Sequence, residues 1–268
     1  RRVMGKEGSK QGVAGVPRLE IIGVTGLPEI AVGTRLGQSI TDACAAQGTP
    51  VLNGDVLVVT QKIVSKAEGR LVRLSSVDPS PLAISFAETS GRDPRLVELV
   101  LRESRSIVRM EPERGIIITE TFHGLVCANS GIDASNVPGD DFVALLPEDS
   151  DASARRILEE IVGTSSLTGI AVVVSDTFGR AWREGHVDFA IGAAGIAPLR
   201  DYRGIHDAVG KMMTVTQIAD IDELAASAEL VMGKTADIPS AIVRGHRFSG
   251  GDAGYKPLIR PRTNDLFR

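Results

Sequence analysis

Short apolar runs bounded by turn residues predict strands at several places along the chain. The clearest is Ala171-Val-Val-Val174, which follows Gly-Ile and is typical of a strand covered on both faces. It is expected to end at Ser175, before Asp-Thr-Phe-Gly-Arg180. Further strands are expected at 18–24, 55–60, 115–119, 142–146 and 241–243.

Apolar positions three or four residues apart predict helices between these strands. Leu36, Ile40 and Cys44 form one such stripe, which ends near Gly48. Other helices are expected at 93–107 and 151–162, and from Asp220 to a stop at Gly233. Helices and strands do not alternate strictly enough for a doubly wound parallel sheet, so the expected class is a mixed α+β fold.

The two ends of the chain differ from its centre. Residues 1–17 are glycine-rich and charged without an apolar period, which predicts a flexible arm. Residues 18–247 carry the predicted elements and form the expected functional domain. Residues 248–268 lack periodicity and contain proline and arginine, so they are interpreted as a linker that does not pack on a core.

Composition excludes several classes of protein. The net charge is −4 and aromatic residues make up 4%, so neither a basic field nor a stacking surface for nucleic acid is present. Cys44 and Cys127 lie in no CxxC pair, and the four histidines have no metal-ligand spacing. No run reaches the roughly 18 apolar residues of a membrane span, and no signal peptide is recognised, which predicts a cytoplasmic protein.

Three polar clusters directly follow predicted strands. The stretch 60–70 has two lysines, an arginine and a glycine-bounded loop, which suits a polyphosphate, although a solvated charged helix start explains it equally well. The stretch 127–137 is rich in Asn, Ser and Asp, whose oxygens suit Mg²⁺. The third, 175–180, is either a plain turn or a second source of a metal carboxylate.

One aspartate from each of two loops, Asp133 and Asp176, is an economical way to hold Mg²⁺ against a nucleotide. The residues alone therefore favour a metal-dependent enzyme that handles phosphoryl groups. Cys127 is interpreted as a core residue rather than a nucleophile.

These clusters, in this order, resemble those of the coenzyme F-420 γ-glutamyl ligases. The resemblance covers about residues 19–245, and its landmarks are the blocks 26–30, 54–69, 128–137, 175–180 and 231–234. It implies an α+β fold of two intimately joined parts, assembled as a homodimer. It also implies GTP-dependent ligation of L-glutamate to a deazaflavin precursor, with γ-linked chain extension, two Mg²⁺ or Mn²⁺ ions per chain and K⁺.

The resemblance assigns roles to individual residues. Asp133 and Asp176 are expected to hold metal, with Thr177 at a second ion, and Lys66 joins the two aspartates as a catalytic residue. The residues after Gly233 vary across the family, so no second-metal ligand is assigned there. The expected nucleotide-lining residues are Leu27, Pro28, Glu29, Ile30, Gln61, Lys62, Lys66, Asn136, Met232, Gly233, Lys234, Thr235, Ala236, Asp237, Ile238 and Pro239.

The 248–268 segment resembles the junction at which family members are fused to a flavin-dependent reductase-like domain. Two alternatives to a ligase remain open. A metal-dependent phosphohydrolase would use the same carboxylates and basic loops with water as the acceptor. A module that presents the deazaflavin to a fused reductase would need no catalysis, although Asp133, Asp176 and Lys66 are all retained.

Overall fold

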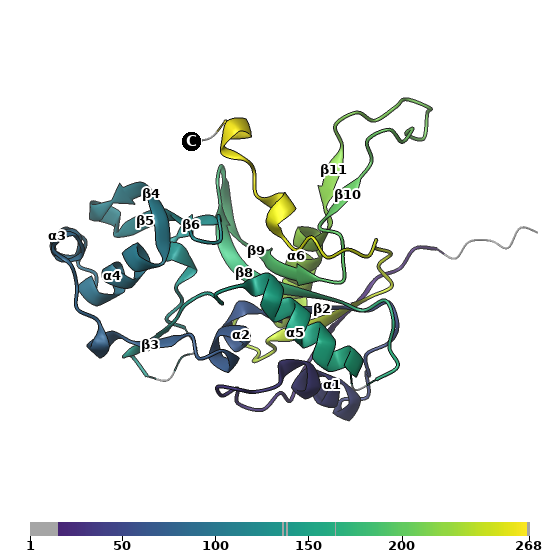
Figure 1. The fold of residues 1–268 in the computed structure, drawn as a ribbon, viewed down its shortest axis with the longest axis horizontal. Helices are drawn as coiled ribbons and strands as arrows, with labels where there is room; N and C mark the ends of the chain where they lie inside the picture. Colours follow the sequence, from purple (N-terminus) through teal and green to yellow (C-terminus); the bar gives the residue numbers. More distant parts are fainter. Residues whose placement is uncertain (1–15, 136, 138, 164, 267–268) are drawn as a thin grey trace, which may run out of the picture.

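A computed structural model describes residues 16–135, 137, 139–163 and 165–266. The predicted arm at 1–17 lies outside these residues except for Val16 and Pro17. Two joined parts are visible in Figure 1, a central sheet with helices and a smaller part built from residues 71–144. The predicted mixed α+β class is confirmed. None of the described helices is long and apolar enough to cross a membrane.

The central sheet is mixed. Its strand order is β1 (Glu20–Gly23), β12 (Ser240–Arg244), β2 (Val56–Thr60), β8 (Ala171–Arg180) and β9 (Arg183–Ala194). Strands β2 and β8 are parallel, with Thr60 opposite Ser175, and the other pairs are antiparallel. The carboxyl end of β2 therefore meets the middle of the longer β8 at one edge of the layer.

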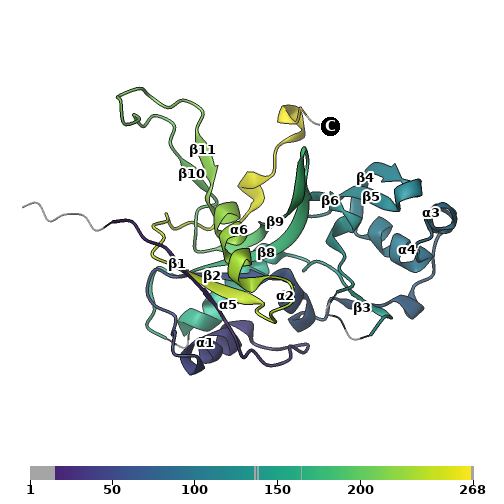
Figure 2. The same cartoon turned by 180° about the vertical axis from the view of Figure 1, so that it is seen from behind.

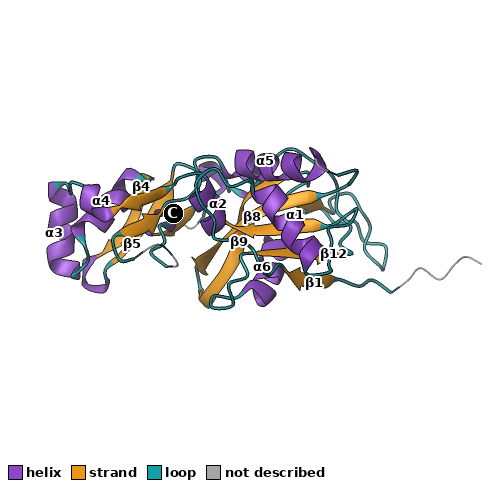
Figure 3. Ribbon diagram, turned by 90° about the horizontal axis from the view of Figure 1, so that it is seen from below, coloured by secondary structure: helices purple, strands orange, loops and turns teal. Residues whose placement is uncertain are grey.

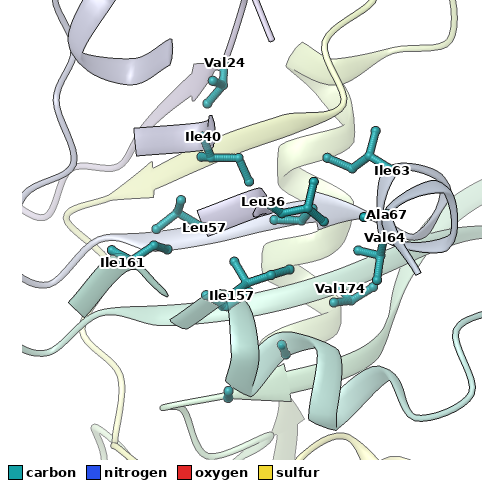
Figure 4. Packing of buried hydrophobic residues seen from close by; sticks show 14 of the residues in the cluster. Val24, Leu36, Ile40, Leu57, Ile63, Val64, Ala67, Ile157, Ile161 and Val174 are labelled. Atoms are coloured by element: carbon teal, nitrogen blue, oxygen red, sulfur yellow. The ribbon is translucent and has the colours of Figure 1, made fainter. Parts of the chain in front are cut away.

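Helices cover both faces of this sheet (Figure 3). One face packs against α1 (Leu36–Ala46) and α5 (Ser150–Gly163), and the other against α6 (Asp220–Met232). Successive β2 residues alternate between the two cores, with Leu57 on the first and Val58 on the second. Figure 4 shows the first core, where Ile157 and Ile161 of α5 lie near Leu57. This double coverage explains why β2 and β8 are continuous apolar runs.

The smaller part has its own sheet and core (Figure 2). Strands β4 (Ser104–Glu111), β5 (Ile116–Thr121) and β6 (Val126–Ala128) form an antiparallel sheet. Helices α3 (Pro81–Ser90) and α4 (Pro94–Arg102) pack on it around Phe86 and Ile117. Strand β3 (Leu71–Arg73) pairs with β7 (Phe142–Ala144) where the chain enters and leaves this part.

One predicted helix is too long. The predicted helix at 93–107 ends at Arg102, and β4 follows at once, with Ile107 opposite Thr119 of β5. Pairing with β5 therefore prevails over the helical pattern of residues 103–107. The charged stretch after Thr60, where a loop and a helix start were both left open, forms helix α2 (Gln61–Ala67), whose residues Ile63 and Val64 are buried in the first core.

A long hairpin projects from the central part (Figure 2). Strands β10 (Leu199–Asp201) and β11 (Gln217–Ala219) form its base. The segment between them carries large apolar side chains in solvent, with Val209 89% and Val215 84% exposed. It is called the β10–β11 hairpin below.

The segment after residue 247 packs on the body, contrary to the expectation from its composition. Tyr255 is 3% exposed, its backbone N–H donates to Asp151 Oδ1 over 3.1 Å, and its hydroxyl donates to the carbonyl of His123 over 2.7 Å. Gly254 has φ +64° and no room for a side chain, since a Cβ would lie 2.1 Å from Asp151 Oδ2. The short helices η4 (Lys256–Leu258) and η5 (Arg262–Asn264) follow. A connection to a further domain stays a prediction.

Candidate functional site

Strand β8 does not end at Ser175, contrary to the prediction. It continues to Arg180 as the first strand of a hairpin with β9, after an irregularity in register between Val174 and Ser175. Phe178 and Phe189 stack across this hairpin with ring centroids 6.2 Å apart. Asp176 and Thr177 therefore lie on a paired strand rather than in a turn, at the edge where β2 gives way to α2.

Lys62 and Asp133 connect the two parts of the protein. The ammonium of Lys62 on α2 lies 2.9 Å from Asp133 Oδ2 and donates to Ser135 Oγ over 2.7 Å. The backbone N–H of Ser135 donates to Asp133 Oδ1 over 2.7 Å, and Asp133 forms an isolated bridge with Ala144. Although burial opposes it, these hydrogen bonds lower the pKa of Asp133, so the carboxylate is held ionised.

Asp176 is the carboxylate in the site whose charge is least compensated. No side chain of the described residues donates a hydrogen bond to it. Burial raises its pKa to about 7, and the negative charges of Asp133 and Asp188 add to this, against the backbone N–H of Thr177 and the charge of Lys234. Asp133 and Asp188 are thus each close enough to Asp176 for their charges to repel it, and a bound cation would relieve that repulsion.

Asp188 on β9 is a site residue that the sequence reasoning missed. It lies opposite Thr177 and is 1% exposed. Ser175 Oγ donates to its Oδ2 over 2.9 Å, and Thr177 Oγ1 donates to its Oδ1 over 2.5 Å. Lys234 donates to Thr177 Oγ1 and lies 3.5 Å from Asp188 Oδ1. The sequence feature that could have identified Asp188 is the single aspartate within the otherwise apolar run Val187-Asp-Phe-Ala-Ile191.

The segments expected to line a nucleotide come together around α2. Lys66 lies 2.7 Å from Glu29 Oε1, which brings the 27–30 loop to this helix. The N–H of Thr60 donates to the carbonyl of Pro239 over 3.0 Å, which brings the 232–239 segment to its other end. Residues 233–237 are exposed, as a loop that contacts a ligand must be. Asn136 lies outside the described residues.

Cys127 is poorly suited to be a nucleophile. It is 6% exposed, and burial together with the charge of Asp176 raises the pKa of its thiol to about 12. The thiolate, which is the reactive form, is therefore suppressed near neutral pH.

The donor set fits one divalent cation at Asp133 and Asp176. Both side chains offer carboxylate oxygens, which hard cations such as Mg²⁺ prefer. Within the described ranges, no group of three or more His, Cys, Asp or Glu side chains is arranged to hold a metal ion. Such an ion would therefore complete its shell with waters or substrate oxygens, which is the usual behaviour of Mg²⁺.

A cavity of about 400 Å³ lies elsewhere, beyond the far end of α2. Charged side chains that line it are paired with one another, as Arg70 is with Glu148 and Arg156 is with Glu68. The carboxylate and lysine cluster lies outside this cavity, and the charge of Asp176 within it is incompletely compensated. Chemistry rather than cavity volume therefore identifies the candidate site.

The fold and site define a mixed α+β protein with acidic and basic side chains gathered where two parallel strands meet. The family model described as "F420-0:Gamma-glutamyl ligase" matches residues 25–245. The chain belongs to this family. It is 44% identical over 255 residues to the coenzyme F420:L-glutamate ligase of Methanothermobacter thermautotrophicus, covering 93% of this chain and 99% of that protein. The protein of the same name from Methanopyrus kandleri is 42% identical over 265 residues, covering 96% of this chain and 100% of that protein.

Proposed function

We propose that this chain ligates L-glutamate to the carboxylate of a coenzyme F-420 precursor, and extends the product by γ-linked additions, using GTP. The observation that carries the proposal is the convergence of Lys62, Lys66, Asp133 and Asp176 around α2. Membership of the ligase family and the names of the two archaeal relatives support the same substrates.

An unactivated carboxylate does not form an amide with an amine near neutral pH, so the carboxylate must first be activated. In the proposed first step, a carboxylate oxygen of the precursor bonds to the γ-phosphorus of GTP, and the bond from that phosphorus to the bridging oxygen breaks. GDP leaves and an acyl phosphate remains. The α-amine of glutamate then attacks the acyl carbon, phosphate leaves, and the nitrogen loses its proton to solvent.

The residues of the site are assigned to charge and position in these steps. Lys62 and Lys66 on α2 would exchange their present partners, Asp133 and Glu29, for phosphate oxygens. The 27–30 and 232–239 segments would contact the rest of the nucleotide. A divalent ion on Asp133 and Asp176 would neutralise charge on the β- and γ-phosphates. The expected requirement for K⁺ is retained in the proposal without assigned ligands.

The β10–β11 hairpin supports the proposed homodimer. Its segment between β10 and β11 exposes Ile205, Val209, Met212 and Val215 at 50%, 89%, 52% and 84% respectively. Large apolar side chains gathered on a projecting element are typical of a surface covered by another protein. A second copy of this chain is the proposed occupant, and sedimentation of Val209→Asp beside the unaltered chain tests it.

Mass spectrometry tests the ligation. The chain is incubated with the deazaflavin precursor, GTP, Mn²⁺, K⁺ and glutamate, and products larger by one or more glutamate residues are expected. Omission of GTP should abolish them. Phosphate release that needs neither glutamate nor precursor, with no larger product, would instead favour the metal-dependent phosphohydrolase.

A further inference from the structure

The ammonium of Lys234 occupies a position surrounded by oxygen atoms. Lys234 follows the end of α6 at Met232 and Gly233. It donates a hydrogen bond to Thr177 Oγ1, and its Nζ lies 3.5 Å from Asp188 Oδ1 and 3.8 Å from Glu229 Oε1. Three separate segments, β8, β9 and α6, thus direct oxygen atoms at one cation that belongs to the chain itself.

The hydrogen bonds around Asp188 show that the ammonium of Lys234 supplies the positive charge beside this carboxylate. The single proton of Thr177 Oγ1 is donated to Asp188, so the same oxygen can only accept from Lys234. Ser175 donates to the other carboxylate oxygen. Both hydroxyl groups are neutral, whereas the Asp188 side chain, which is 2% exposed, forms an ion pair with Lys234. Among the described residues, Lys234 is the cationic side chain that pairs with it.

The charges of the site can then be counted. Lys62 pairs with Asp133, and Lys234 pairs with Asp188. Asp176 is left without a cationic partner in contact, although it lies close enough to Asp133 and Asp188 for their charges to act on it. With Glu229, which lies 3.8 Å from Lys234, four carboxylates face two lysines, and one divalent cation balances the net charge of −2.

We propose that Lys234 supplies the second positive charge of the site as a fixed ammonium group, so that this chain binds one divalent ion, at Asp133 and Asp176, and none at Thr177 and Asp188. This inference rests on the proposed function for the presence of the first ion. It departs from the expectation of two ions per chain.

Geometry opposes a second ion where Lys234 now lies. A divalent ion ligated by Thr177 Oγ1 would lie about 2.0–2.6 Å from that oxygen. The ammonium of Lys234 is hydrogen-bonded to the same oxygen. Ion and ammonium would then lie within about 5 Å of each other, with like charges and shared ligands, so one excludes the other.

The number of bound Mn²⁺ ions tests the proposal without any turnover. The metal-free chain of residues 1–268 is titrated with Mn²⁺, and the free ion is measured by electron paramagnetic resonance. We expect one ion per chain for the unaltered protein, one for Lys234→Arg and two for Lys234→Gln, because glutamine removes the charge and keeps an oxygen. Asp176→Asn should lose the single ion. Lys256→Gln, at an exposed position in η4, is the matched control and should bind one.

Thermal unfolding gives an independent measurement on the same variants. Without metal, Lys234→Gln should melt at a lower temperature than Lys256→Gln, because Asp188 loses its counter-charge. Mn²⁺ should then raise the melting temperature of Lys234→Gln by more than that of the unaltered chain. An equal rise in both proteins would overturn the proposal.

The remaining outcomes separate this inference from the proposed function. Two ions, or none, on the unaltered chain would overturn it, as would one ion on a folded Lys234→Gln. A chain that binds two ions and still adds glutamate to the precursor would overturn this inference alone. A chain that binds one ion and adds no glutamate would overturn the proposed function and leave the ion count standing.

Discussion

The ammonium of Lys62 and the carboxylate of Asp133 lie 2.9 Å apart, and this ion pair joins α2 of the central part to the loop that follows β6 in the smaller part. Side-chain exposures of 20% for Lys62 and 32% for Asp133 leave both groups reachable by a ligand. A ligand that exchanged with either member of this pair would therefore contact both parts at once.

Replacement of either carboxylate that is proposed to hold the metal should abolish ligation without unfolding the protein. Asp133→Asn and Asp176→Asn each keep the shape of the side chain and remove a negative charge from a cluster of three. Loss of one metal carboxylate is expected to lower the rate about 100-fold or more. Product formation at saturating Mn²⁺ and a circular dichroism spectrum are the measurements. Near-normal turnover of either variant would refute its assignment as a ligand.

Lys66→Ala should weaken GTP binding more than it raises the KM for glutamate, because the Lys66 ammonium is assigned to phosphate. Titration calorimetry with GTP and initial rates at varied glutamate give the two quantities. Glu29→Gln removes the present partner of Lys66 and is the matched variant, for which GTP affinity should hold or rise. Unchanged nucleotide affinity with a higher KM for glutamate would instead place Lys66 in the amino-acid site.

Both cysteines should resist modification in the folded protein. Burial is the main cause that raises the pKa of Cys44 to about 11 and that of Cys127 to about 12. A thiol-reactive dye at pH 8 should label neither residue until denaturant is added. Cys127→Ala should retain ligase activity, since no covalent intermediate on sulfur is proposed. Loss of activity in a folded Cys127→Ala would reopen its role.

Deletion of the segment after residue 249 should destabilise the protein. Loss of the buried Tyr255 alone, as in Tyr255→Ala, is expected to cost about 3–5 kcal/mol. Tyr255→Phe removes only the hydrogen bond to the carbonyl of His123 and should cost about 1 kcal/mol. Urea unfolding of these three proteins measures the differences. A truncated chain as stable as the full one would show that the packing of this segment contributes nothing.

Glu98 should make the smaller part sensitive to acid. The hydrogen bonds from Ser80, assisted by Arg102, lower the pKa of Glu98 from its ordinary value of 4.5 to about 2. Because the folded-state pKa lies below the unfolded value, the stability from Glu98 is complete above about pH 4.5 and is lost as the pH falls towards 2. Unfolding free energies measured across this range should fall less steeply for Glu98→Gln. Identical slopes would contradict this contribution.

The sequence alone determined those elements whose signal is local. The apolar runs at 56–59 and 171–174 report burial on both faces, and Asp220 and Gly233 mark the start and stop of α6. Asp133 and Asp176 were also singled out as candidate site residues from the sequence, although Asp176 lies within β8 rather than after it. The resemblance that the family match confirms came from the sequence as well. Such features depend on neighbouring residues, so they can be predicted without knowledge of the fold.

Only the tertiary structure decided which distant segments meet. The extension of β8 to Arg180 and the change from α4 to β4 depend on pairing with β9 and β5. Asp188 becomes a site residue because that pairing puts it opposite Thr177, and Tyr255 is buried because Asp151 and His123 lie beneath it. Periodicity records whether a position is buried but not which partner buries it, since strand pairing and side-chain contacts form between residues far apart in the chain.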